Sequence, residues 1–438
     1  MSRLKFLAAI FPIIFFPASK SYAFSLAEAW KAAVNYSADY SASKHERNAE
    51  AEQKQQARSA LLPKIAANAS YQRHPSSSSS ETRSQGWNIQ ASQVLFDKSR
   101  YAQYKQGKLA EESANAKLDS KEGELLLNVS KAYFDVLLQK DKLSAIRKEK
   151  SAYEQQMKQA KEMFKQGAAT IIDTHEAKSG YDAALSKEIE TLTQLEIAEN
   201  TLADMTGLNP KLIKTIKISP NNTNLLGYTK EQDWQLLAES HNPEWLQQKL
   251  ALASSKEGLK AAKGKHWPTV TLNGGYQNNM NTVENEAYGG EYKYRSKGGT
   301  ISVDVNMPLY TGGETSSLIR QAAAQEMQNE DLLTATERKI RLEIKQAYRS
   351  TSSNKILMMA QERLLVTNQA KLDSTKLGRQ VGVRNNLEEI QAQQNKAEAE
   401  QKLAEAKYAY VQSYLQLLNS AGVLTEPERQ TQIHQSLY

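Results

Sequence analysis

The chain has 438 residues and a formal net charge of +7, from 56 Lys and Arg against 49 Asp and Glu, and it contains no cysteine. The lack of cysteine excludes disulfide frameworks, thiolate nucleophiles, cysteine zinc sites and a lipid anchor on an N-terminal cysteine. Only 20 glycines and 10 prolines interrupt the chain, so we predict that it is mostly long helix.

Residues 1–23 are predicted to be a secretory signal peptide. Two basic residues precede an apolar stretch from Phe6 to Pro17, and Ser21-Tyr22-Ala23 forms a small-x-small cleavage site. Cleavage before Phe24 removes three basic residues and no acid, which lowers the net charge from +7 to +4. A retained N-terminal anchor is the alternative, but the apolar stretch is short for a bilayer span. The remaining charge is too small to indicate a nucleic-acid partner.

An internal repeat organises the rest of the chain. Leu62-Pro63-Lys64-Ile65 is echoed 205 residues later by Trp267-Pro268-Thr269-Val270, and Gly167 is echoed 215 residues later by Gly382. We therefore predict a first structural repeat at 24–222, a second at 223–422 and a C-terminal tail at 423–438. Each repeat is expected to contain a helix, two strands, a very long helix, a tight turn and a returning helix.

Two strand pairs are predicted, at about 64–73 and 87–96 in the first repeat and at about 269–278 and 300–309 in the second. The clearest run is Thr300–Met307, in which apolar and polar residues alternate strictly. A run of about ten residues has the length of a tilted strand that crosses a bilayer. No uncharged apolar run of 18 residues follows the signal peptide, so these strands must make any membrane crossing.

Two polar segments, His74–Gly86 and Asn278–Lys297, are predicted to be long loops at one end of these strands. Long polar loops at one end are typical of outer-membrane strands, and they favour that interpretation over a half-buried soluble hairpin. Four strands leave open edges within lipid, so copies of the chain must complete a barrel. A dimer would supply about eight strands and a trimer about twelve, and the residue pattern allows both.

The segment 98–164 is predicted to be one helix, because it contains no proline and only two glycines. At 1.5 Å per residue it would extend for roughly 100 Å. Val129, Val136 and Leu143 recur every seven residues, a period that favours coiled-coil packing. The returning helix at about 170–205 is the expected partner, and the second repeat shows the same pattern. For nearly all of these residues the expected role is structural.

These features together resemble the outer-membrane efflux protein (TolC) family. The resemblance covers about Phe24–Leu424 and includes Pro63 and Pro268 at the starts of the first strands and the turn Leu309-Tyr310-Thr311-Gly312-Gly313 after the last strand. It implies an α+β membrane protein that forms a homotrimer. The trimer would build a twelve-stranded β-barrel, with four strands per chain, continued by a long α-helical coiled-coil barrel.

The resemblance also implies a location and a function. The channel-tunnel would lie in the Gram-negative outer membrane and extend into the periplasm. It would be the exit duct of a tripartite efflux pump or a type I secretion system, exporting small toxic compounds such as drugs, dyes and detergents, or proteins. A periplasmic adaptor (membrane fusion) protein and an inner-membrane pump of the RND, ABC or MFS type would be its partners. Drug efflux and protein secretion both stay open as its main task.

The two predicted helix-hairpin tips are the candidate functional site. Each has a turn glycine, Gly167 or Gly382, and an acid six residues later, Asp173 or Glu388. A side chain that can cap the returning helix precedes each acid by three residues, which predicts a capping box in both hairpins.

The resemblance assigns further roles at these tips. It implies that Arg384 and Asp173 form a gate pair at the closed periplasmic entrance, and that Glu388 forms a selectivity ring there. The turns at Gly167 and Gly382 would contact the adaptor or the pump. Two residues depart from the family pattern: Gln391 stands where a second ring acid is expected, and Arg379 stands where a gate tyrosine is expected.

No pattern indicates an enzyme. The six histidines are scattered, none has metal-ligand spacing, and no glycine-rich phosphate loop follows a strand. We therefore predict no catalytic residue, no metal and no cofactor. An exported coiled-coil structural or adhesin protein is the alternative, but it does not require amphipathic strands of bilayer length. An exported glycosidase would need acids that converge on loops, whereas the acids here are spread over helix faces.

Overall fold

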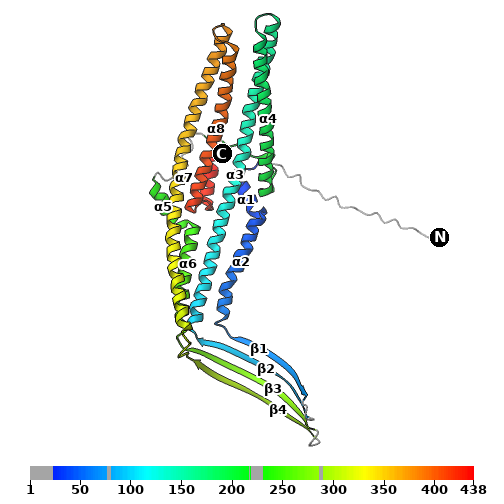
Figure 1. Ribbon diagram of the computed structural model, residues 1–438, viewed down its shortest axis with the longest axis vertical. Coiled ribbons are helices and arrows are strands. Elements are labelled where there is room, and N and C mark those ends of the chain that lie inside the picture. The colour runs from blue at the N-terminus through cyan, green and yellow to red at the C-terminus, as the bar shows by residue number, and fades with distance from the viewer. Residues whose placement is uncertain (1–22, 76–79, 217, 219–229, 286–289) are drawn as a thin grey trace, which may run out of the picture.

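The computed structural model describes residues 23–75, 80–216, 218, 230–285 and 290–438. The predicted signal peptide, except for its last residue, lies outside the described residues. Figure 1 shows a long molecule with a sheet at one end and paired helices that extend away from it to two tips at the other end. Within the described ranges, no helix has the length and apolarity that a membrane crossing requires.

The two halves of the chain contain the same elements in the same order. The first half has α1 (Leu26–Tyr36), α2 (Ala38–Ser59), β1 (Lys64–Pro75), β2 (Ser80–Phe96), α3 (Lys98–Lys165) and α4 (Ile171–Thr206). The second half has α5 (Glu231–His241), α6 (Pro243–Gly264), β3 (Thr269–Asn285), β4 (Gly290–Asn306), α7 (Glu314–Gln380) and α8 (Asn386–Ala421). A short 3-10 helix, η1 (Pro210–Leu212), follows the first half, and α9 (Pro427–Leu437) follows the second. The boundary predicted at residue 222 lies outside the described residues.

The four strands form one antiparallel sheet in the order β1-β2-β3-β4. Strands β2, β3 and β4 each contain 17 residues, whereas the sequence predicted about ten. A bilayer crossing uses about 9–11 residues of a tilted strand, so each of these strands is several residues longer than a crossing requires.

The predicted long loops at His74–Gly86 and Asn278–Lys297 are wrong. Residues 80–86 pair with β3, and residues 278–285 pair with 290–297 of β4. The remaining connections, 76–79 and 286–289, lie outside the described residues. Polar composition misleads here because strand pairing is made by the backbone, and a strand with water on both faces needs no apolar alternation.

Alternating side chains give the sheet an apolar face and a polar face. The apolar face carries Ile65, Ala67, Tyr71, Trp87, Ile89, Val270, Leu272, Tyr276, Ile301, Val303 and Val305. In the single chain these side chains are exposed to solvent, except those of Val270 and Leu272, which are half-buried, and Ile301 is 85% exposed. The polar face carries mainly Asn, Ser, Gln and Thr. An exposed apolar face of this kind fits a lipid environment.

Two long helix pairs make up the rest of the molecule. Helices α3 and α7 have 68 and 67 residues, and each is followed by a returning helix of 36 residues, α4 or α8. Asp97 begins α3 by accepting hydrogen bonds from the backbone N–H groups of Ser99 and Arg100. The predicted seven-residue repeat is confirmed, because Val129, Val136 and Leu143 are all buried.

The hydrophobic core lies midway along the helices, where α1, α3, α8 and α9 meet. Trp30 of α1 donates a hydrogen bond to Ser130 of α3 at 2.8 Å. The hydroxyl of Tyr133 lies 2.7 Å from the hydroxyl of Tyr438 at the end of α9. These contacts join α1 and α9 to α3 in a core that includes residues of both hairpins, and the tips extend beyond it (Figure 1).

Candidate functional site

Each hairpin reverses direction at a glycine in the left-handed region. The φ angles are 70° at Gly167 and 80° at Gly382, and open space surrounds both positions, so the backbone angle alone favours glycine there. The predicted capping boxes are confirmed. Thr170 exchanges hydrogen bonds with Asp173 at the start of α4, and Asn385 exchanges them with Glu388 at the start of α8.

The structure does not bring Arg384 to Asp173 within one chain. Arg384 Nη1, in the turn before α8, instead donates to Glu388 Oε1 in the first turn of α8 at 2.8 Å. Asp173 Oδ2 accepts from the backbone N–H and the hydroxyl of Thr170, both at 2.8 Å. The bond from Arg384 and the backbone N–H of Asn385 together lower the pKa of the Glu388 carboxyl. The predicted gate residue and the predicted ring residue are thus joined to each other.

Arg379 joins the two hairpins of one chain. Its Nε atom lies 2.8 Å from Glu389 Oε2, and its Nη1 atom donates to Asn386 Oδ1 at 3.1 Å. Its Nη2 atom donates across to Gln159 Oε1 of α3 at 2.6 Å. The Arg379 side chain is 22% exposed and that of Glu389 only 7%. The guanidinium therefore neutralises a buried carboxylate and reaches the other hairpin with the same group.

A second polar contact lies beside this one. Gln156 Nε2 of α3 donates to Glu389 Oε1 at 3.3 Å, and both side chains are buried. Among the described residues no donor is aligned for a hydrogen bond to Glu389 Oε2, so charge alone binds it to Arg379. We call Arg379, Glu389, Gln156 and Gln159 the hairpin clamp. The sequence pointed to one member, because Arg379 replaces an expected tyrosine, but it did not indicate Glu389 or the glutamines.

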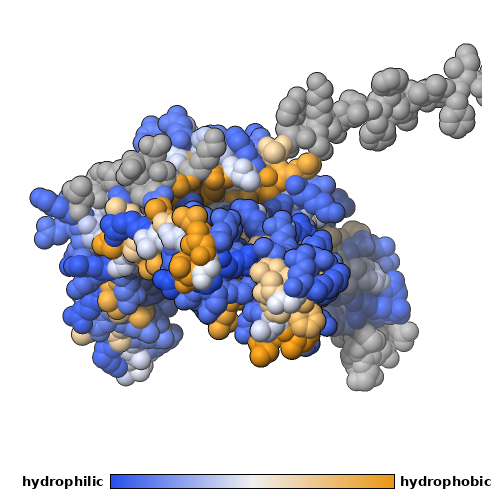
Figure 2. All heavy atoms as spheres, turned by 90° about the horizontal axis from the view of Figure 1, so that it is seen from above, coloured by the Kyte–Doolittle hydropathy of each residue, from blue (hydrophilic) through white to orange (hydrophobic). Residues whose placement is uncertain are grey.

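Exposed apolar side chains surround both turns. Met163, Phe164, Ile171 and Ile172 lie around the first tip, and Leu377, Val381, Val383 and Leu387 lie around the second. Figure 2, which looks down onto this end of the molecule, shows hydrophobic patches set among hydrophilic residues. Apolar side chains gathered at an exposed end mark a contact surface more often than a solvated one. The sequence predicted the capping acids of these segments, but it did not predict the exposed apolar side chains beside them.

Charged groups also meet below the tips. Glu188 of α4 accepts from Arg147 Nε of α3 at 3.0 Å and also contacts Lys150. Next to these, Glu149 of α3 is 3% exposed. Burial raises the pKa of the Glu149 carboxyl, nearby Lys187 opposes this rise, and Glu398 of α8 adds to it. Through the part of the chain that the structure describes, no group of three or more His, Cys, Asp or Glu side chains could hold a metal ion.

Known proteins match both the sequence and the fold. The profile of the family described as outer membrane efflux protein matches residues 31–208 and 235–423. The outer membrane protein TolC of Vibrio cholerae is 29% identical over 384 residues, which cover 85% of this chain and 84% of TolC. The proteases secretion protein PrtF of Dickeya chrysanthemi is 24% identical over 424 residues, which cover 93% of this chain and 90% of PrtF.

Solved structures show the same fold at lower identity. A membrane protein from Pseudomonas aeruginosa has a TM-score of 0.75 at 18% identity, with 92% of this chain and 95% of that chain covered. The MtrE outer membrane channel of Neisseria gonorrhoeae in its open state has a TM-score of 0.75 at 16% identity, with 91% and 89% covered.

Proposed function

The chain belongs to the outer membrane efflux protein family, and on that premise we propose that three copies form a closed twelve-stranded barrel with a helical duct below it. It is an exit duct of the Gram-negative outer membrane, and the family is one of transport channels rather than enzymes. The exported structural or adhesin protein considered from the sequence has no support from these matches.

The sheet is the observation that carries the proposal. One face is apolar and exposed, and the outer strands β1 and β4 each have one edge that pairs with no described strand. Backbone N–H and C=O groups at such edges are too costly to leave unpaired in hydrocarbon. If β4 of one copy pairs with β1 of the next, the edges disappear. Three copies then give about twelve strands around a polar lumen, a size within the range of bacterial barrels.

The hairpin tips would form the periplasmic entrance of this duct. In a ring of three copies, Arg384 of one tip can meet Asp173 of a neighbouring tip, because Arg384 lies in an exposed turn and the half-buried Asp173 lies in the first turn of α4. We propose that this pair holds the entrance closed between copies. Three Glu388 carboxylates at the same level would form a ring that favours cations.

The partners are an adaptor and a pump. The exposed apolar residues around Gly167 and Gly382 support docking of a periplasmic adaptor protein at the tips. The pump would be an inner-membrane transporter of the RND, ABC or MFS type. The names of the relatives cover both an outer membrane efflux protein, BepC of Brucella suis, and secretion proteins for proteases. We therefore propose small toxic compounds and secreted proteins as the two classes of cargo.

Assembly and conduction test this proposal together. The mature chain, purified in detergent, should have the mass of a trimer in native mass spectrometry and should open ion-conducting channels in planar bilayers. A monodisperse monomer with full β-sheet signal would contradict closure by copies. A stable trimer that never conducts would contradict the duct.

A further inference from the structure

Charged side chains gather at the end of the sheet farthest from the helices, and they lie on one face. Five cations and three acids occupy the last rows of the apolar face: Arg73, Arg83, Lys293, Arg295, Lys297, Glu81, Glu284 and Glu291. We call the five cations the basic band. On the polar face, the same rows hold mainly Asn, Ser, Tyr and Thr together with Val283 and two glycines, and among the described residues they hold no Asp, Glu, Lys or Arg. The charge therefore points away from the lumen.

The cations lie next to the lipid-facing residues and the acids lie beyond them. The strand register places Lys297 in the row of Trp87 and Arg295 in the row of Tyr71. Arg73, Arg83 and Lys293 share the following row, and the three acids share the last one. Trp and Tyr side chains mark the level of lipid headgroups in membrane proteins. The basic band thus begins at headgroup level.

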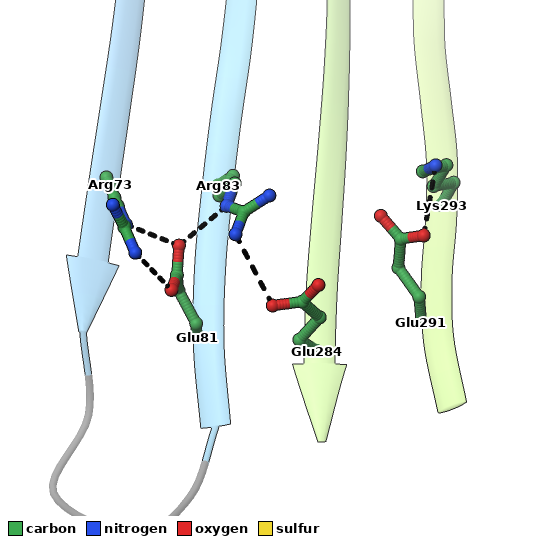
Figure 3. A network of polar contacts seen from close by, with 6 residues as sticks. All are labelled: Arg73, Glu81, Arg83, Glu284, Glu291 and Lys293. Carbon is green, nitrogen blue, oxygen red and sulfur yellow. Dashed lines mark hydrogen bonds and ion pairs between the residues drawn. The ribbon is translucent and has the colours of Figure 1, made fainter. Parts of the chain in front are cut away.

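Ion pairs hold part of this band in place (Figure 3). Glu81 accepts from Arg73 Nε at 2.5 Å and from Arg83 Nε at 2.6 Å, so one carboxylate orients two guanidinium groups. Arg83 also lies 3.5 Å from Glu284, and Lys293 lies 3.0 Å from Glu291. Arg295 and Lys297 pair with no carboxylate in the described part of the chain. The band keeps a net positive charge nearest the lipid.

We propose that the basic band binds the phosphate groups of the anionic glycolipid in the outer leaflet of the outer membrane. This inference rests on the proposed function, which places the far end of the sheet at the cell surface. Arg groups suit phosphate because their N–H groups form a planar fork, and the Nη1 atoms of Arg73 and Arg83 donate to no carboxylate in the described part of the chain. The cations lie in rows nearer the membrane and the acids lie in the last row, so the sheet presents positive charge at a single depth, where the lipid phosphate groups would lie. Charged residues that only kept the loops soluble would not need to place the cations nearer the lipid than the acids.

Binding of lipid A to the purified channel tests the proposal. The probes are bisphosphorylated lipid A and the same lipid after dephosphorylation, titrated onto the detergent-solubilised protein in EDTA and followed by native mass spectrometry. The test variant carries Lys293→Gln, Arg295→Gln and Lys297→Gln. Each cation near an anionic lipid surface is worth about fivefold in affinity, so this variant should bind about a hundredfold more weakly.

Two further variants serve as controls. Arg320→Gln, Lys345→Gln and Lys371→Gln remove the same three charges from exposed positions on α7, and they should leave lipid A affinity unchanged. Lys293→Arg, Arg295→Lys and Lys297→Arg keep the charge of the band and should keep the affinity. Loss of binding in this charge-preserving variant would mean that binding depends on strand shape and would overturn the proposal.

The remaining outcomes separate this inference from the proposed function. Equal binding of phosphorylated and dephosphorylated lipid, or wild-type affinity in the triple glutamine variant, would overturn the inference if the wild-type protein conducts in planar bilayers. A wild-type trimer that does not conduct would overturn the proposed function whatever lipid it binds. The triple glutamine variant should itself conduct normally, since the band lies outside the lumen.

Discussion

Replacing Arg379 with alanine should loosen the contact between the two hairpins of each chain. Arg379 is the cation that faces the buried Glu389, at 2.8 Å, and it is also a donor to Gln159 on the other hairpin, at 2.6 Å. After the substitution, Glu389 would keep only the hydrogen bond from Gln156, at 3.3 Å. A carboxylate with 7% exposure would then be left without its counter-charge.

The burial of the pair sets the expected magnitude. Removing one partner of a buried ion pair costs about 3 to 5 kcal/mol, because the other charge is left desolvated. Arg379 is 22% exposed, so some water reaches the pair and the lower figure of about 3 kcal/mol applies. A change of that size shifts an equilibrium by roughly a hundredfold. If the closed entrance depends on the clamp, the open state should become that much more populated.

Single-channel conductance in planar bilayers and the sensitivity of cells to vancomycin measure this shift. Both should rise in Arg379→Ala. Arg363→Ala is the matched control, since Arg363 is an exposed arginine on the same helix and should leave both readouts unchanged. Adding Glu389→Gln to Arg379→Ala removes the unpaired charge and should recover part of the lost thermal stability. Wild-type conductance in Arg379→Ala, or no recovery in the double variant, would refute the reasoning.

Four further predictions concern single residues. Arg384→Ser should raise conductance because it removes the proposed pair with Asp173 of a neighbouring copy. Unchanged conductance would mean that the hairpin clamp, and not this pair, keeps the entrance closed. Glu388→Gln should lower the cation preference, measured as a smaller reversal potential in a salt gradient; an unaltered potential would argue against a carboxylate ring. A cysteine at Glu291 should react with an impermeant thiol reagent on intact cells and one at Ala168 should not, and the opposite result would invert the orientation. Because burial raises the pKa of Glu149, the folded state holds that proton more tightly than the unfolded state, and stability should fall as the pH rises from the ordinary value of 4.5 through the raised pKa. Glu149→Gln should flatten that fall in melting temperature, and an unchanged slope would show that other groups cause it.

Much of the fold could be predicted from the sequence because its signals are local and repeated. The lack of proline between 98 and 164 and the seven-residue spacing of Val129 and Val136 follow directly from helix geometry. The capping boxes at Asp173 and Glu388 involve residues three apart on the same chain segment. Such patterns depend little on the rest of the molecule, so they were confirmed.

Strand length was harder to predict because the alternation of apolar and polar residues depends on what surrounds each face of the strand, whereas strand length depends on backbone pairing. Apolar alternation in β3 and β4 ends near Asn278 and Lys297, but pairing continues to Asn285 and Gly290. The pattern therefore marks where lipid would end, and the register marks where the strand ends. The charged rows of the apolar face lie between these two limits, so they could not be placed on a strand from composition alone.

Contacts at the tips depend on how the hairpins are rotated against each other, which no local pattern records. Arg379 and Arg384 are five residues apart on the same hairpin, yet Arg379 turns inward to Glu389 whereas Arg384, with a side chain 57% exposed, stays at the surface. Only a surface group can reach another copy. The structure therefore places the two arginines differently, one between the hairpins of a single chain and the other at the surface. Arg379 contacts both hairpins of one chain, and under the proposed gate Arg384 would bind a neighbouring copy, so opening the duct would require the release of contacts at two levels.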